Sequence, residues 1–236
     1  MRFLIVHAHH EPESFNGAMT RAACEALAAA GHDVIVSDLY AMGFDPVSDR
    51  RNFRGAANAS RLDQQAEERH ASAHDGFAPD LQAEMDKLAW CDVLVLQFPI
   101  WWLGLPAILK GWIDRVFAVG RAYGGGLWFD RGRLSGKRAM LSVTMGGPEG
   151  AYRDDGMYGA SAKSILHPIN HGTLGFVGFC VVEPFIVYAP GRMDEEARLR
   201  ALAEYRTRLL DLENAPTLPM PCSDDYENFL PRHKGP

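Results

Sequence analysis

Three short segments of the chain combine residue types that bind phosphate or a flat polar ring. The first, residues 9–16, reads His-His-Glu-Pro-Glu-Ser-Phe-Asn and directly precedes a predicted helix. Unpaired backbone amides and the positive end of the helix dipole suit such a position to phosphate. Ser14 and Asn16 can cap the helix, and His9 can add an N–H donor. From this segment alone, an ordinary capped helix is an equally good interpretation.

The other two segments suit a planar heterocycle. Residues 99–106 read Pro-Ile-Trp-Trp-Leu-Gly-Leu-Pro. Adjacent tryptophans in an extended loop cannot both face one core, because neighbouring side chains point to opposite sides. Residues 144–152 read Thr-Met-Gly-Gly-Pro-Glu-Gly-Ala-Tyr, and their glycines let the backbone approach a ligand closely. Tyr152 adds a phenolic donor.

Five short apolar runs predict the strands that position these segments. None of the runs alternates apolar with polar residues, so each is expected to be covered on both faces, as in a parallel sheet. The runs are residues 3–6, 34–36, 93–96, 139–143 and 180–187.

Helical patterns lie between the apolar runs. Apolar spacing predicts a helix over residues 19–30, ended by Gly31, while Pro79, Pro106 and Asp194 begin further helices. This alternation predicts an open, doubly wound α/β fold with a five-stranded parallel sheet and helices on both faces. In such sheets ligands bind beyond the carboxyl ends of the strands, where the three segments lie.

Two regions are predicted to lack regular structure. Residues 44–78 are polar and read as a long irregular excursion, and residues 215–236 form a proline-rich, extended C-terminal tail after a catalytic domain at 1–214. Pro168 is expected to break any helix that would place His167 and His171 on one face.

Composition excludes several classes of protein. Lys and Arg number 24 against 30 Asp and Glu, a net charge of −6, which argues against a nucleic-acid partner. The longest apolar stretch, residues 93–109, is interrupted by polar and proline residues and is too short to insert in a membrane. Four dispersed cysteines indicate reduced thiols and a cytoplasmic location. The G-x-G-x-x-G and G-x-S-x-G motifs are absent from the sequence.

One phosphate segment and two ring segments at the same sheet edge predict a flavin nucleotide bound to a flavodoxin-like sheet. The chain resembles the NAD(P)H:quinone oxidoreductase (DT-diaphorase-like) flavoprotein family, and the resemblance extends from residue 1 to about residue 222. The matching positions are His9 with 14–16, 37–42, 97–99, Trp102, 106–112, 115–117, Thr144 with 146–147, and 183–184.

The resemblance implies a homodimeric enzyme that binds FAD, with FMN as the less favoured cofactor. NAD(P)H would give a hydride to the flavin and leave, and a quinone would then take the hydride. An arginine at the position of Arg198 contacts the adenylate part in that family, which favours FAD. The implied cofactor-binding residues are His9, Ser14, Phe15, Asn16, Pro99, Ile100, Trp101, Trp102, Leu103, Thr144, Met145, Gly146, Gly147, Tyr152 and Arg198.

The resemblance also implies catalytic and substrate-binding positions. Tyr152 and Tyr158 are the catalytic pair, although the family often has histidine at the second position. Tyr123, Gly124 and Phe176 are substrate-binding, and Tyr123 would cap the site of the partner subunit. Some family members hold a structural zinc ion.

The zinc ligands of those family members are only partly matched here. His171 and Cys222 stand at two ligand positions, but Gly175 replaces another, so no metal site is predicted. Two alternative functions stay open. One is an FMN-dependent azo- or nitro-compound reductase. The other is a regulatory flavin-binding subunit of a potassium-efflux system, with the acidic tail as a docking arm.

Overall fold

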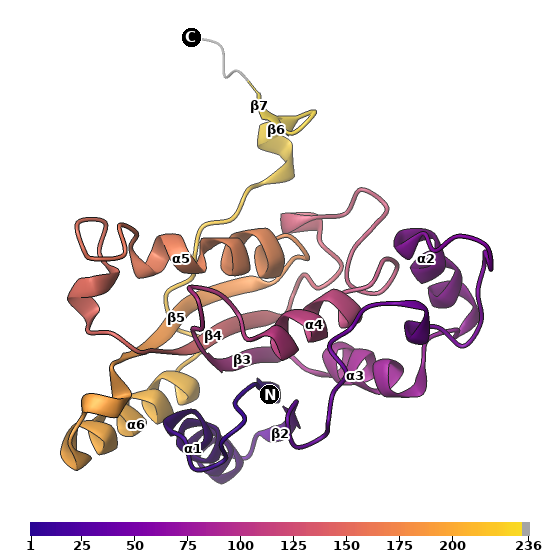
Figure 1. Ribbon diagram of the computed structural model, residues 1–236. Coiled ribbons are helices and arrows are strands. Elements are labelled where there is room, and N and C mark those ends of the chain that lie inside the picture. The colour runs from indigo at the N-terminus through magenta and orange to yellow at the C-terminus, as the bar shows by residue number, and fades with distance from the viewer. Residues whose placement is uncertain (233–236) are drawn as a thin grey trace.

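Five parallel strands form the central sheet of the computed structural model, which describes residues 1–232 (Figure 1). Their order is β2-β1-β3-β4-β5, and every neighbouring pair is parallel. The predicted flavodoxin-like, doubly wound sheet is therefore confirmed. The strands are β1 Arg2–His7, β2 Asp33–Asp38, β3 Val93–Pro99, β4 Arg138–Met145 and β5 Cys180–Tyr188.

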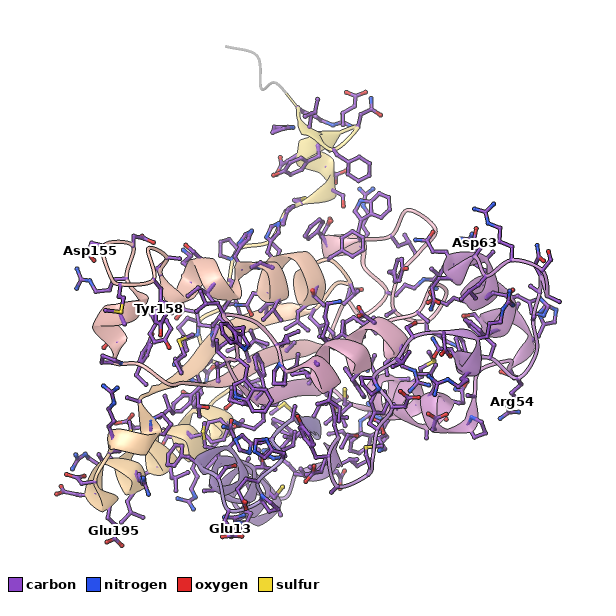
Figure 2. The ribbon with its side chains drawn as sticks, in the orientation of Figure 1. Glu13, Arg54, Asp63, Asp155, Tyr158 and Glu195 are labelled. Atoms are coloured by element: carbon purple, nitrogen blue, oxygen red, sulfur yellow. The ribbon has the colours of Figure 1, made fainter. Side chains whose placement is uncertain are left out.

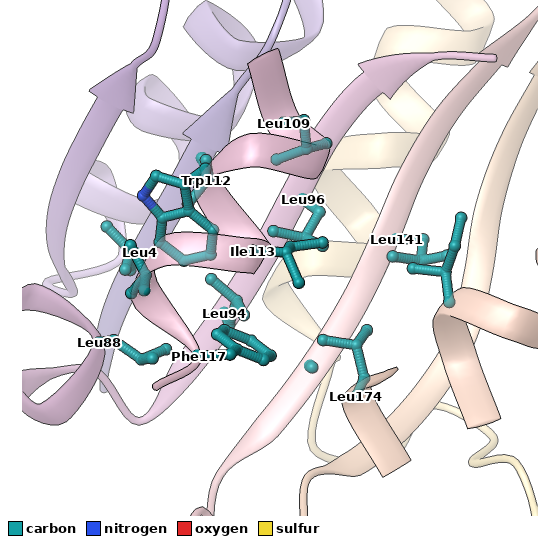
Figure 3. Close-up of a cluster of buried hydrophobic side chains, with 14 of the residues drawn as sticks. Leu4, Leu88, Leu94, Leu96, Leu109, Trp112, Ile113, Phe117, Leu141 and Leu174 are labelled. Carbon is teal, nitrogen blue, oxygen red and sulfur yellow. The ribbon is translucent and has the colours of Figure 1, made fainter. Parts of the chain in front are cut away.

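Helices cover both faces of this sheet. Successive residues of a strand point to opposite faces, so Phe3 packs toward one helical layer and Leu4 toward the other. Figure 3 shows the hydrophobic core on the Leu4 side of the sheet. There Trp112 and Leu174 lie beside strand residues such as Leu94. One layer holds α1 Phe15–Ala29 and α6 Glu195–Leu210, and the other holds α3 Pro79–Trp90, α4 Ala107–Val116 and α5 Ala162–Ile169.

The expectation that residues 44–78 are irregular is wrong. They contain a 3₁₀ turn, η1 Arg50–Asn52, and the helix α2 Gln64–His74. The buried face of α2 consists of Glu67, Glu68 and Ala71, so it lacks the apolar stripe by which a helix is recognised. Glu67 accepts hydrogen bonds from the amides of residues 57 and 58, and Glu68 from that of residue 119. This helix is therefore held in place mainly by hydrogen bonds from backbone amides to its two buried carboxylates, rather than by apolar packing.

The expected break at Pro168 is also wrong. Helix α5 passes through Pro168 and continues into a π-helical turn, η4 Asn170–Gly175. The wider turn shifts the hydrogen bonding, so that the amide of Phe176 donates to the carbonyl of His171. The rings of His167 and His171 stack, with centroids 4.7 Å apart.

The C-terminal tail first lies along the outer edge of β5. The amide of Glu183 donates to Pro216, and the amide of Leu218 donates to Val181, each at 2.8 Å. The tail then forms a 3₁₀ turn and a projecting hairpin (Figure 1). These elements are η6 Ser223–Asp225, β6 Tyr226–Glu227 and β7 Leu230–Pro231. The last four residues of the predicted tail lie outside the described residues.

No helix between residues 1 and 232 combines the length and apolar character needed to cross a bilayer.

Candidate functional site

The loop after β1 brings open amides to the N-terminus of α1. Ser14 is the N-cap, and its side chain accepts from the amide of Gly17 at 3.1 Å. Across the described chain, the amides of Phe15 and Asn16 have no acceptor. A Cβ atom on Gly17 would lie 2.0 Å from the carbonyl oxygen of Pro12, so only glycine lets the loop pack this closely on the helix. The result is an anion-binding position.

His9 in this loop is held in one tautomer. Its Nδ1 accepts from the amide of Glu11 at 3.0 Å, so in the neutral ring the proton is on Nε2. Burial lowers the pKa of His9, and the neighbouring His10 adds to this effect. His9 can therefore present an Nε2–H donor at neutral pH.

A buried chain of side chains fixes the helix to the sheet. Gln97 Nε2 donates to Asn16 Oδ1 at 2.8 Å, and Asn16 Nδ2 donates to Thr144 Oγ1 at 2.9 Å. All three residues are buried and come from β3, α1 and β4. The first loop thus has a defined position relative to the other two.

The loop after β3 is a tight turn with unusual backbone conformation. Trp101 and Gly104 exchange both of their backbone hydrogen bonds, and the intervening Trp102 and Leu103 have φ angles of 52° and 56°. Left-handed non-glycine residues cost roughly 1–3 kcal/mol each and gather at functional sites. Trp102 is fully exposed, and within residues 1–232 neither its amide nor that of Leu103 has an acceptor. The turn therefore offers an indole and two amides to a ligand.

The loop after β4 orients a phenol. The amide of Gly147 donates to Tyr152 Oη at 3.2 Å, and the Tyr152 hydroxyl also has a side-chain hydrogen bond with Tyr158. Burial raises the pKa of Tyr152. The half-exposed Tyr158 stacks on Tyr152, with ring centroids 4.9 Å apart.

One cleft of about 480 Å³ lies between the first loop, the carboxyl ends of β3 and β4, and α6. Residues 100–103 and 145–152 do not line it. Its predicted lining residues are His9, Ser14, Phe15, Asn16, Pro99, Thr144 and Arg198. Arg198 donates through Nε to the carbonyl of Pro190 at 3.3 Å. Pro190 and Gly191 also line the cleft and were missed. They follow the carboxyl end of β5, so the strand-end rule applied to β5 would have found them.

The structure keeps other predicted residues apart from this cleft. Tyr123 and Phe176, whose ring centroids are 6.3 Å apart, line a separate cavity of about 260 Å³. Gly124 follows Tyr123, with a φ of 115°. The side chain of Met145 is fully buried, so only its backbone can reach a ligand.

Ile100 lies at the base of the strained turn. Its amide donates to the carbonyl of Thr144 at 2.9 Å, which joins the second and third loops. Figure 2 shows Tyr158 and Asp63 at opposite ends of the molecule, so α2 does not approach the Tyr152–Tyr158 pair of its own chain.

Among residues 1–232, no cluster of three or more His, Cys, Asp and Glu side chains is placed to hold a metal ion. At Gly175 a Cβ atom would lie 2.4 Å from Met220 Sδ, so Met220 takes the space there.

The chain matches the model of the flavodoxin-like fold family over residues 1–209. It is 44% identical to NAD(P)H dehydrogenase [quinone] 1 of Cavia porcellus, covering 88% of this chain and 76% of the relative. It is 39% identical to ribosyldihydronicotinamide dehydrogenase [quinone] of Homo sapiens, covering 94% and 95%. A proposed quinone reductase from Klebsiella pneumoniae superposes with a TM-score of 0.89 at 37% identity, covering 93% and 87%. The chain belongs to the flavodoxin-like fold family and, within it, groups with quinone-reducing dehydrogenases.

Proposed function

We propose that the protein is a flavin-dependent NAD(P)H:quinone oxidoreductase that binds FAD and transfers two electrons as a hydride. The observation that carries this proposal is the set of open amides beyond β1 and β3, which lie at one edge of the sheet beside the loop after β4. The names of the quinone-reducing relatives support the same reaction.

The residues present fit a flavin dinucleotide. The amides of Phe15 and Asn16 and the Nε2–H of His9 would hold the pyrophosphate. The strained turn and Gly146, whose Cβ position has no neighbour within 4 Å, would hold the ring system. The cleft continues past the anion position to Arg198 on α6, which leaves space and a cation for an adenylate group. This extension supports FAD over FMN.

When bound, the flavin supplies reversible hydride chemistry. The chain's own contribution is electrostatic. The Tyr152 hydroxyl, positioned by the Gly147 amide, would stabilise negative charge that develops beside it. Tyr158 packs on that ring and restricts its motion. The hydride donor, NAD(P)H, and the hydride acceptor, a quinone, would occupy the site in turn.

We further propose a homodimer in which Tyr123, Gly124 and Phe176 of one protomer complete the substrate site of the other. This assignment explains why two of these residues line a cavity apart from the cleft of their own chain. Free cysteines at all four positions support a reducing, cytoplasmic location.

A single preparation tests the proposal. The purified protein should be yellow, release FAD on denaturation as identified by mass, and oxidise NADH or NADPH with a small benzoquinone. Colourless protein that neither binds added FAD nor consumes reductant would disprove it. Release of FMN would instead favour the azo- or nitro-reductase function.

A further inference from the structure

A second cavity, of about 440 Å³, lies between α5, β5 and the tail, outside the proposed flavin cleft. Its walls are mainly apolar. The apolar lining comes from Leu166 on α5, Pro184 and Ile186 on β5, and Leu218 and Met220 on the tail. A volume and lining of this kind are typical of sites for small organic molecules.

The walls of this cavity have fixed positions in the fold before any ligand binds. Its outer wall is the tail, which is fixed to β5 by the hydrogen bond from the Leu218 amide to Val181. Met220 seats against Gly175, where any Cβ atom would clash with its sulfur. A preformed cavity requires little ordering when a ligand enters, which favours binding.

A few polar groups lie among the apolar walls. Asn170 lines the cavity, is 4% exposed, and its side-chain oxygen has no hydrogen-bond donor in the described part of the chain. A buried carboxamide oxygen without a partner is costly, and a ligand hydroxyl group would satisfy it. The Tyr188 hydroxyl and the His171 ring supply further donors and acceptors in the same lining.

The charged groups of the lining lie at its exposed rim. Lys163 on α5 and Glu183 on β5 are both exposed, so water solvates them and they contribute little to selecting a ligand. The buried part of the cavity therefore favours an uncharged, mainly apolar occupant.

We propose that this cavity binds a neutral aromatic molecule that carries one or two hydroxyl groups. The ring contacts Leu166, Ile186 and Leu218, and a hydroxyl group bonds to the Asn170 carboxamide. Tyr188 forms one wall of the cavity, and its ring centroid lies 5.8 Å from that of Tyr152. The occupant would therefore be separated from Tyr152, in the loop after β4, by the Tyr188 ring. The binding does not depend on the proposed redox reaction.

The test uses 2-naphthol, whose own fluorescence reports binding, with the flavin-saturated protein. Leu218→Trp fills the cavity and should weaken binding by at least about 10-fold, through loss of the space the ring requires. Thr217→Trp is the matched control, because the neighbouring residue does not line the cavity. Binding to this control should equal that of the unmodified protein. A second cavity-filling variant, Ile186→Phe on β5, fills the cavity from the opposite wall. A loss of binding in this variant does not result from a local change in the structure of the tail.

The hydroxyl group is tested from the ligand side. 2-Methylnaphthalene keeps the shape of 2-naphthol without the hydroxyl and should bind about 5–10-fold more weakly, through loss of one hydrogen bond to a buried group. Equal binding of 2-naphthol by the protein and both cavity-filling variants would overturn the proposal, as would an equal loss in Thr217→Trp. Equal affinity for the methyl compound would overturn the assigned ligand class.

Discussion

The backbone amide of Gly147 donates a hydrogen bond to the hydroxyl oxygen of Tyr152 at 3.2 Å. These two groups are not independent donors toward a bound ring, because the amide is engaged by the phenol. The glycine holds the phenol in place, and Tyr152 is buried, with 6% of its surface exposed. A Cβ atom at residue 147 would lie 3.3 Å from the Tyr152 ring, so a larger residue here would require the ring to shift by a few tenths of an ångström.

This pairing sets the expected effect of Tyr152→Phe. Loss of one donor to developing charge commonly slows a reaction by 100-fold or more, but here the released Gly147 amide can take over part of that role. We expect flavin reduction to slow by about 10-fold, measured by stopped flow under saturating NADH. Tyr188→Phe, which lacks the contact with Gly147, is the control. An unchanged reductive rate in Tyr152→Phe would remove Tyr152 from the mechanism.

Gly17→Ala tests the anion position at the start of α1. The new methyl group would meet the Pro12 carbonyl at 2.0 Å, so the loop must move away from the helix. We expect about 10-fold weaker flavin binding, measured by fluorescence titration of the flavin-free protein. Gly172→Ala, whose Cβ position is open and whose φ is not positive, should bind flavin normally. Normal binding by Gly17→Ala as well would place the phosphates elsewhere.

Arg198→Gln separates the two flavins. Arg198 lines the cleft beyond the anion position, so its removal should weaken FAD by roughly 10-fold and leave FMN affinity unchanged. The control is Arg200→Gln, which removes an exposed arginine paired with Glu196 on the same helix. Titrations with both flavins give the result. Parallel losses for FAD and FMN would mean that Arg198 does not contact an adenylate group.

His7 gives the stability a defined pH dependence. It is buried, its Nδ1 lies 2.8 Å from Thr20 Oγ1, and burial lowers its pKa below the usual value of about 6.5. The unfolded chain therefore takes up this proton first as the pH falls. Stability from the neutral ring is fully present above about pH 6.5 and declines below it, toward the lowered pKa of the folded state.

The corresponding experiment follows the melting temperature of the protein with bound flavin from pH 7.5 to 5. His7→Gln should flatten the decline below about pH 6.5, because the substituted side chain does not titrate in that range. His74→Gln, at the exposed end of α2, should retain the slope of the unmodified protein. An identical slope in His7→Gln would show that other groups cause the dependence.

A mixing experiment tests whether the site is shared between protomers. Phe176→Ala and Tyr152→Phe impair opposite sides of the proposed site. A hybrid dimer of the two variants would contain one site with both residues intact. Co-expressed variants should therefore exceed the activity of either parent. If each chain forms its site alone, every site keeps one defect and the mixture shows only the average of the parents.

The sheet and most of its helices could be predicted because their signal is apolar. The runs at 93–96 and 139–143 are buried on both faces, so their composition alone indicates parallel strands. Helix α2 could not be recognised in this way, since its buried positions are mostly carboxylates. The π-helical turn after Pro168 depends on hydrogen bonding that a sequence pattern does not record.

The candidate site, like the fold, could be predicted only in part. Its loops follow from the strand-end rule, but the left-handed conformation of Trp102 and Leu103 does not, because tryptophan and leucine disfavour it. The pairing of Gly147 with Tyr152 also depends on the folded backbone. The resemblance named Tyr123 and Phe176, and the structure places them in a cavity apart from the cleft.

The tail segment at 216–218 also protects the outermost strand of the sheet. Its hydrogen bonds occupy polar groups of β5 that would otherwise be open to another chain. A protein shortened before Pro216 would carry a bare, mostly apolar strand at its rim. Such a protein should aggregate when it is concentrated, whereas the full-length protein should not.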